Sequence, residues 1–249
     1  MKPFFVGYLP VPPALRSFLI VISMALIGFM AGFGLIAGTT QDDPGPAAYR
    51  FDYGRQNVTG VIELLPYPLL RVTEGTDRVP AGHTLMLVTP NKGSVMERAA
   101  PLDGQLAKAS GIILERGDLD MMQVRGGRRG IAAADGSGDV PEAQPLGRWK
   151  LAGEICDGKC LAGAMRPGRG LAHKACANLC ITTGAPPVFV SSQPVEGDEF
   201  LLIAGPDGGP MPADMLHFVG QYVSLEADIE RRGDMLVMRL DPATVQVLP

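Results

Sequence analysis

The chain has 249 residues and a net charge of −4, and 46% of its residues are hydrophobic. A net charge this small gives no electrostatic basis for binding nucleic acid or anionic lipid, so we expect neither partner. Glycine and proline are frequent, at 32 and 22 residues, while aromatic residues make up 6% of the chain. This composition favours short strands and loops over long helices, which predicts a mainly β protein.

An apolar segment near the N-terminus predicts a transmembrane helix over residues 18–38. No residue between Arg16 and Asp42 carries a charge, and the segment supplies about the 20 apolar residues that a helix needs to cross the hydrocarbon core. A cleaved signal peptide is the alternative interpretation. The apolar run is longer than the roughly 7–15 residues typical of signal peptides, and no clear cleavage site follows it, so we expect an anchor.

Charges on the two sides of this segment predict its orientation. Lys2 and Arg16 precede it, whereas Asp42 and Asp43 follow it. The positive-inside rule therefore places residues 1–17 in the cytoplasm, along the membrane surface, and the chain after the segment outside it. We expect a single-pass protein of the inner membrane with most of its chain in the periplasm, where cysteines can oxidise.

Glycines within the segment predict close packing against another membrane helix. Gly28 and Gly32 have the GxxxG spacing, and so do Gly34 and Gly38. Small residues at this spacing let two helices approach closely, although glycine is also common in membrane helices without a partner. We therefore expect an integral membrane protein complex as the partner of this chain.

An internal repeat organises the rest of the chain. Residues 83–124 align without a gap on residues 199–240, at an offset of 116 residues, and ten of the 42 aligned positions are identical. The identical positions include Arg-Gly-Asp at 116–118 and 232–234, where the glycine supplies a positive φ to a hairpin turn. Identity concentrated at turn residues is typical of a duplicated module.

Each copy has the strand pattern of a small closed β-barrel. Two strands, an irregular connection and two more strands around the Arg-Gly-Asp turn are typical of OB-like barrels, whose closure removes exposed edges. We therefore predict an all-β fold with two tandem OB-like modules, at 50–126 and 147–249. Residues 39–49 link the first module to the membrane helix, and a Gly/Pro-rich linker at 127–146 separates the modules.

The two copies differ in the connection that follows their first strand. The first copy uses 25 residues from Gly60 to Leu85, whereas the second uses 48 residues from Gly153 to Leu201. The additional residues contain every cysteine of the chain. Because function is commonly grafted on such an elaborated loop, we expect the site in the second module and a structural role for the first.

The elaborated loop carries five residues that can bind a metal: Cys156, Cys160, His173, Cys176 and Cys180. If the stretch that ends at Gly184 is helical, His173, Cys176 and Cys180 share one face and can converge on one ion. Thiolates and an imidazole suit Zn²⁺ and, with the thioether of Met165 nearby, also Cu⁺.

Two other states of the cysteines compete with a metal site. Structural disulfides are the expected state, because a small module outside the cytoplasm needs cross-links; the four cysteines allow three connectivities. A redox-active dithiol is the other alternative, although the thioredoxin-type CxxC is absent from the sequence. Covalent haem is not expected, because the sequence contains no CxxCH motif.

Nine residues of this loop follow the pattern Asp-x-x-Cys, Gly-x-x-His-x-x-Cys-Ala-x-x-Cys and Gly-x-Pro. They are Asp157, Cys160, Gly170, His173, Cys176, Ala177, Cys180, Gly184 and Pro186. In this pattern the stretch resembles a group of small exported bacterial proteins; the resemblance does not extend to the membrane segment or the first module. Cys156 falls outside the pattern. Since three thiols cannot all pair, the resemblance implies a Cys₃His-like site or one disulfide plus a reactive thiol, and it names no reaction.

The sequence leads to two hypotheses about function. No Ser/His/Asp set, paired-carboxylate motif or phosphate-binding loop stands out, so an enzymatic role is not predicted. The first hypothesis is an accessory, structural subunit on the periplasmic side of a larger membrane complex, such as a respiratory or electron-transfer complex. The alternative is a periplasmic metal-binding or thiol-redox protein that acts through the Cys/His loop.

Overall fold

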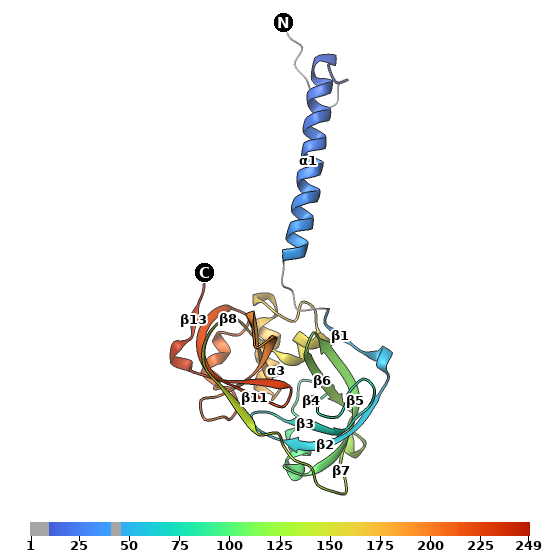
Figure 1. Ribbon diagram of the computed structural model, residues 1–249, viewed down its shortest axis with the longest axis vertical. Coiled ribbons are helices and arrows are strands. Elements are labelled where there is room, and N and C mark those ends of the chain that lie inside the picture. Colours follow the sequence, from blue (N-terminus) through green and yellow to red (C-terminus); the bar gives the residue numbers. More distant parts are fainter. Residues whose placement is uncertain (1–9, 41–45) are drawn as a thin grey trace. The chain divides into compact units, whose positions relative to one another are not determined.

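The computed structural model describes residues 10–40 and 46–249, with the backbone but not the side chains of residues 38–40 and 128 (Figure 1). The chain divides into two compact units, Met1–Asp43 and Pro44–Pro249. Each unit is described by itself.

The first unit contains helix α1 (Pro13–Thr40). Among the described residues, α1 is the one helix long and apolar enough to cross a membrane, over Pro13–Ala37, which fits a membrane anchor or a signal sequence. The helix begins before residue 18, so part of the segment expected on the membrane surface is helical, while residues 1–9 lie outside the described residues. Proline is tolerated in the first turn of a helix, because its missing N–H has no partner there in any case.

The glycines of α1 are open to a neighbour. A Cβ atom built on Gly28, Gly32 or Gly34 meets no atom of the described residues within 4 Å. Gly38 belongs to the residues whose side-chain surroundings are not described. Packing of another helix against these glycines stays a prediction.

The second unit begins with a closed five-stranded barrel. Its strands are β2 (Gln56–Glu63), β3 (Leu69–Glu74), β4 (Thr84–Val88), β5 (Leu106–Arg116) and β6 (Leu119–Val124). The strand order is β5-β2-β3-β4-β6, with β4 and β6 parallel, and the pairing of β5 with β6 closes the ring. The short strands β1 (Ala48–Tyr49) and β7 (Ile131–Ala133) pair with β5, and helix α2 (Met96–Ala99) lies between β4 and β5.

A second closed five-stranded barrel follows. Its strands are β8 (Ala143–Asp157), β9 (Pro187–Val195), β10 (Asp198–Ala204), β11 (Tyr222–Arg232) and β12 (Met235–Leu240). The order β11-β8-β9-β10-β12 and the parallel pair β10–β12 repeat the first barrel, and the pairing of β11 with β12 closes the ring. Strand β13 (Gln246–Val247) pairs with β11, and helix α3 (Lys174–Thr182) lies between β8 and β9.

Short 3₁₀ turns connect several of these elements. They are Phe51–Tyr53, Ala100–Leu102, Gly127–Arg129, Leu171–His173, Ala213–His217 and Pro242–Thr244. The predicted linker at 127–146 contains β7 and the start of β8, and the predicted linker at 39–49 contains β1. Strand pairing therefore ties parts of both linkers to the barrels.

The structure repeats with the offset seen in the sequence. Strands β11 and β12 begin and end 116 residues after β5 and β6. The register repeats as well, because Ile113 faces Met122 across β5 and β6, and Ile229 faces Met238 across β11 and β12. The two barrels are therefore two copies of one module.

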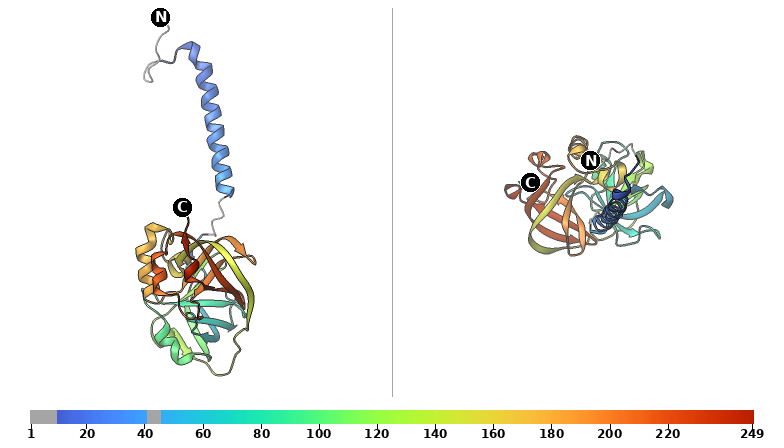
Figure 2. Two further views of the ribbon diagram at one scale, coloured as in Figure 1. Left: turned by 90° about the vertical axis from the view of Figure 1, so that its left-hand side faces the viewer. Right: turned by 90° about the horizontal axis from the view of Figure 1, so that it is seen from above.

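The two barrels lie side by side and share an apolar interface (Figures 1 and 2). Leu85 of β4 and Leu201 of β10 are fully buried in the separate cores of the first and the second barrel. The residues that follow them, Met86 and Leu202, point the other way and pack in one cluster between the barrels. Both faces of β4 and β10 are thus buried, which explains why these strands read as continuous apolar runs in the sequence.

Candidate metal centre

The main difference between the barrels is the connection after the first strand. In the first barrel residues 64–68 join β2 to β3, whereas in the second barrel residues 158–186 join β8 to β9. This insertion contains a helical turn at Cys160–Ala164 and helix α3. Gly184 ends α3 with a φ of 99°, and the next amide donates a 2.9 Å hydrogen bond to the carbonyl of Cys180.

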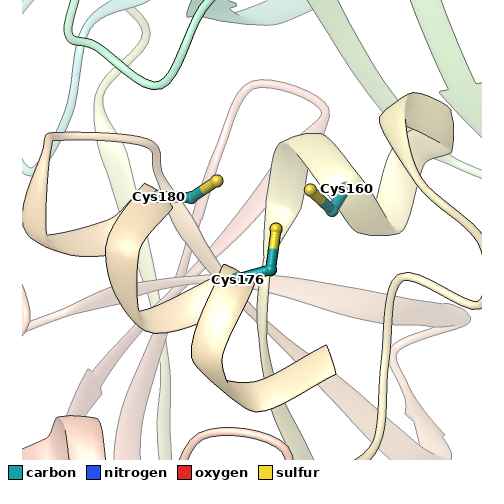
Figure 3. Close-up of side chains that lie close together, drawn as sticks. All are labelled: Cys160, Cys176 and Cys180. Carbon is teal, nitrogen blue, oxygen red and sulfur yellow. The ribbon is translucent and has the colours of Figure 1, made fainter. Parts of the chain in front are cut away.

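Three thiol groups converge within this insertion (Figure 3). Cys160 lies on the helical turn, and Cys176 and Cys180 lie one turn apart on α3. Their sulfur atoms are within 4.8 Å of one another. Cys160 and Cys180 are buried, while Cys176 is half-buried and gives the cluster access to solvent. We call these three residues the sulfur cluster.

The expected disulfides are absent from the structure. All four cysteines lie in the described part of the chain, and all four are free thiols. Within α3 the reason is geometric, because Cβ atoms four residues apart on a helix are about 5–6 Å apart, whereas a disulfide needs about 3.5–4.5 Å. The sulfur cluster instead presents three separate thiol groups to a common point.

A second group of ligand atoms adjoins the sulfur cluster. Asp157, Cys160 and His173 each offer one atom, and these atoms are also within 4.8 Å of one another. Asp157 is completely buried at the end of β8, and His173 is 4% exposed in the 3₁₀ turn before α3. Cys160 therefore belongs to both groups.

The two groups do not merge into one site. Within the described residues, His173 does not join Cys176 and Cys180 in a single set of mutually close ligand atoms. The spacing argument placed these three residues on one helical face, but α3 begins at Lys174, and His173 lies in the preceding 3₁₀ turn. The structure thus brings His173 to Asp157, a residue that the spacing argument did not consider.

Cys156 lies apart from both groups. It packs among the apolar side chains between the barrels, and its thiol donates a 3.3 Å hydrogen bond to Oε1 of Glu154. Burial, and secondarily the charge of Glu154, raise the pKa of the Cys156 thiol well above its ordinary value. Within the described residues Cys156 joins neither group of mutually close ligand atoms, so it does not belong with the candidate ligands.

A lysine from the first barrel reaches the sulfur cluster. Nζ of Lys92 lies 2.8 Å from Sγ of Cys176 and 3.2 Å from Sγ of Cys180. Lys92 follows β4, so both barrels contribute to the site. This contact was not predicted from the sequence, because Lys92 lies in the module to which we assigned a structural role.

A second, buried lysine fixes the loop that carries Lys92. Nζ of Lys159 donates hydrogen bonds of 2.6, 3.0 and 3.1 Å to the carbonyl oxygens of the three residues at 89–91. Lys159 is 7% exposed, and burial lowers its pKa. The insertion of the second barrel therefore holds the Lys92 loop of the first barrel through one side chain.

The thiols of Cys160 and Cys180 differ in their tendency to lose a proton. The hydrogen bond between Cys160 and Cys180 and the burial of Cys160 raise the pKa of the Cys160 thiol. The same hydrogen bond lowers the pKa of Cys180, and the Lys92 ammonium adds to this effect against the opposing effects of burial and of Asp157. The two opposite shifts favour the proton on Cys160 and the negative charge on Cys180.

The carboxyl group of Asp157 is also held in its charged form. Burial favours the neutral acid, but hydrogen bonds from His173 and Cys160 outweigh it, and the net effect lowers the pKa of Asp157. Its Oδ1 accepts the backbone N–H of Cys160 at 3.1 Å. A buried carboxylate and a thiolate thus lie close together, and such a pair of negative charges favours a bound cation.

The surroundings of the sulfur cluster supply one more soft donor and an apolar rim. Sδ of Met165 lies 3.3 Å from Sγ of Cys176. Three large apolar side chains near the cluster are exposed: Met165 at 44%, Leu171 at 68% and Leu179 at 52%. The insertion thus exposes three large apolar side chains as well as the half-buried Cys176.

These donors can hold a soft or borderline metal ion. Thiolate sulfur suits Zn²⁺ and Cu⁺, and the carboxylate and imidazole of the second group suit Zn²⁺. Comparison with protein-family models, with curated proteins and with solved structures finds no match to this chain.

Proposed function

We propose that this chain is a membrane-anchored metal-binding protein and that the sulfur cluster of Cys160, Cys176 and Cys180 holds the metal. One observation carries the proposal: three free thiol groups from two separate segments lie within 4.8 Å of one another. Sulfur ligands of one tetrahedral Zn²⁺, with bonds of about 2.3 Å, are about 3.8 Å apart. The cluster therefore needs little rearrangement to bind an ion.

The surroundings support a metal rather than a packing role for these thiols. Two of the three are buried beside the carboxylate of Asp157, while the third opens to solvent and gives an ion a route of entry. The thioether of Met165 stands next to Cys176 as a further soft donor for Cu⁺. For Zn²⁺ the fourth position is open to water or to a neighbouring ligand.

A thiol-redox role is the second candidate for the same residues. The lowered pKa of Cys180 favours it, because the thiolate is the form that attacks disulfides. Under this alternative, exchange with a substrate disulfide joins two of the cluster's sulfur atoms, reduces the substrate disulfide to two thiols and leaves the third cluster thiol free. The metal-binding role and the redox role therefore predict different metal contents and different thiol counts.

The experiment is to purify the full chain in detergent without chelators and under exclusion of oxygen. We expect at least one Zn²⁺ or Cu⁺ per chain by elemental analysis, and protection of the three cluster thiols from alkylation until a chelator is added. Cys176→Ser should remove the metal that the sulfur cluster holds. Cys156→Ser is the matched control, because it removes a buried thiol outside the cluster, and it should keep the wild-type metal content.

Two outcomes count against metal binding. Four alkylatable thiols without metal would leave the cluster as a packing feature. The redox role would be identified instead if the wild type had two fewer free thiols than expected and a reductant restored them. Cys176→Ser or Cys180→Ser should then not show this loss.

We also propose that both barrels are OB-like. The support is the strand order, which is the same in the two barrels and includes one parallel pair, β4–β6 or β10–β12. A five-stranded ring of this kind, with a short helix in the connection between β4 and β5, fits the description of a Greek-key OB barrel. In the second barrel the insertion occupies the connection between the first two strands, where OB folds often bind ligands.

An accessory role in a larger membrane complex is compatible with metal binding and is our further proposal. Its support is the apolar helix α1 together with the exposed side chains of Met165, Leu171 and Leu179 near the cluster. In this arrangement α1 anchors the chain in the inner membrane and the barrels lie in the periplasm. Mild solubilisation of native membranes should recover the chain with partner subunits, and recovery as a free monomer would contradict this role.

A further inference from the structure

We propose that the centre holds two metal ions bridged by the thiolate of Cys160. The first ion is the one bound by the sulfur cluster. The second is bound by Asp157, Cys160 and His173. This inference rests on the proposed metal-binding function and adds a second position to it, because Cys160 is common to both groups of ligand atoms.

The distance between Asp157 and His173 fits two ligands of one ion. Oδ2 of Asp157 lies 3.4 Å from Nε2 of His173. This is longer than the 2.7–3.2 Å usual for N–H···O hydrogen bonds. Oxygen and nitrogen ligands at about 2.0–2.1 Å from a tetrahedral Zn²⁺ are themselves about 3.4 Å apart. The two side chains thus stand at the spacing that an ion between them requires.

Hydrogen bonds hold the side chain of Asp157 and the backbone of His173 in place. Oδ1 of Asp157 accepts the N–H of Cys160, which leaves Oδ2 directed at His173. The backbone N–H of His173 donates to the carbonyl of Gly170 at 2.9 Å, and the N–H of Gly170 donates to the carboxylate of Glu154. Support of this kind orients ligands before the metal arrives.

The two positions differ in the chemistry of their donors. The sulfur cluster offers three soft sulfur atoms, which suit Cu⁺ or Zn²⁺. The second position offers one oxygen, one nitrogen and one sulfur atom, a mixed set that suits Zn²⁺. A deprotonated Cys160 has more than one lone pair on its sulfur and can therefore bond to both ions. Loading both positions releases the thiol proton of Cys160 to solvent.

The stoichiometry of Zn²⁺ binding tests this inference on the full chain in detergent under reducing conditions. We expect two Zn²⁺ per wild-type chain by equilibrium dialysis and elemental analysis. His173→Gln and Asp157→Asn should each bind one. His217→Gln is the matched control, because His217 lies outside both groups of ligand atoms, and it should bind two.

Co²⁺ provides a second measurement that reports the bridge itself. Two Co²⁺ ions that share one thiolate are magnetically coupled, so the fully loaded wild type should give a weaker paramagnetic resonance signal than two isolated ions. His173→Gln loaded with one Co²⁺ should give the full signal of a single ion. Protection of Cys176 and Cys180 from alkylation in this variant shows that the sulfur cluster is still folded and loaded.

The outcomes separate this inference from the proposed function. If the wild type and His173→Gln each bound one Zn²⁺ per chain, the second position would be overturned, while metal binding by the sulfur cluster would stand. Two ions that both persist in His173→Gln would also overturn it. No bound ion in the wild type would overturn the proposed function and this inference together.

Discussion

The two barrels are copies of one module, and their largest difference lies in the connection between the first two strands. Residues 64–68 cross between the first two strands of the first barrel, and residues 158–186 make the equivalent crossing in the second. The strands around these connections keep the same order, pairing and register. The candidate ligands all belong to the second copy, on the longer connection and at the end of the strand that precedes it.

The first barrel nevertheless contributes to that site. Lys92 follows β4, the strand whose equivalent in the second barrel is β10, and its ammonium lies on Cys176 and Cys180. The buried Lys159 of the second barrel holds the same loop by three hydrogen bonds. A duplicated module can thus divide its roles, with one copy carrying the thiols and the other supplying a cation to them.

The largest predicted effect tests whether the two barrels fold as one unit. Leu85→Ala and Leu201→Ala change equivalent, fully buried residues in the separate cores. Each should lower the free energy of unfolding by about 2–5 kcal/mol, because a buried leucine leaves a cavity. Since the barrels share an apolar interface, each variant should unfold in a single transition, followed by circular dichroism in urea.

Leu65→Ala is the control for these variants, because Leu65 is 57% exposed and should change stability little. Two separate transitions, with each variant shifting one of them, would show that the barrels are independent domains. The interface of Met86 and Leu202 would then be too weak to couple them.

A second prediction concerns the pH dependence of the contact between the barrels. His83 of the first barrel places Nε2 3.0 Å from Asp120 and Nδ1 2.5 Å from Asp234 of the second barrel. Burial acts to lower the pKa of His83, but the hydrogen bonds to both carboxylates raise it from 6.5 to about 9. The charged imidazolium therefore links the barrels at neutral pH.

The sign of the effect follows from the raised pKa of His83. Its contribution to stability is fully present below about pH 6.5 and is lost as the pH rises through about 9. Because Asp234 is partly exposed, we expect about 1–2 kcal/mol. Urea titrations between pH 6 and 10 should show this loss in the wild type but not in His83→Gln. Equal slopes for both proteins would contradict the link.

Much of the fold was predictable because its signals are local. The Arg-Gly-Asp turns predicted hairpins, and Gly117 and Gly233 have the expected positive φ, 55° and 63°. The packing of the barrels on each other was not predicted. An apolar run such as the one around Met86 indicates burial, but it does not say which surface covers the outer face of the strand.

The site was predictable only as far as it is contiguous in sequence. Proximity in the cysteine-rich loop grouped Cys160, Cys176 and Cys180, and helix spacing placed Cys176 and Cys180 on one face, as the structure has them. Proximity also placed Cys156 with them, although that residue alternates to the other side of β8 and packs between the barrels. Lys92 could not be found, because its contact depends on the packing of two modules.

A third prediction tests the contribution of the first barrel to the centre. Lys92→Met should weaken metal binding about tenfold, because charge-assisted hydrogen bonds to the sulfur atoms of Cys176 and Cys180 are lost. The difference should shrink at high salt, since Lys92 is exposed and its charge is screened. Competition with a chromogenic chelator measures the affinity.

Lys174→Met is the matched control. Lys174 lies on α3, but its ammonium donates to the carbonyl of His217, so this variant should bind metal as the wild type does. Tighter binding by Lys92→Met would show that the ammonium competes with the metal for the thiolates, and the first barrel would then oppose metal loading.

The smallest predicted effect separates Cys156 from the three cysteines of the cluster. Cys156→Ala should leave the metal content unchanged and lower the free energy of unfolding by about 1 kcal/mol, since it removes one buried sulfur atom and one weak hydrogen bond. Glu154 keeps the N–H of Gly170 and the guanidinium of Arg169 as partners, so no buried charge is left alone. If Cys156→Ala lost as much metal as Cys176→Ser, Cys156 would be a ligand, and the site would extend to the apolar interface between the barrels.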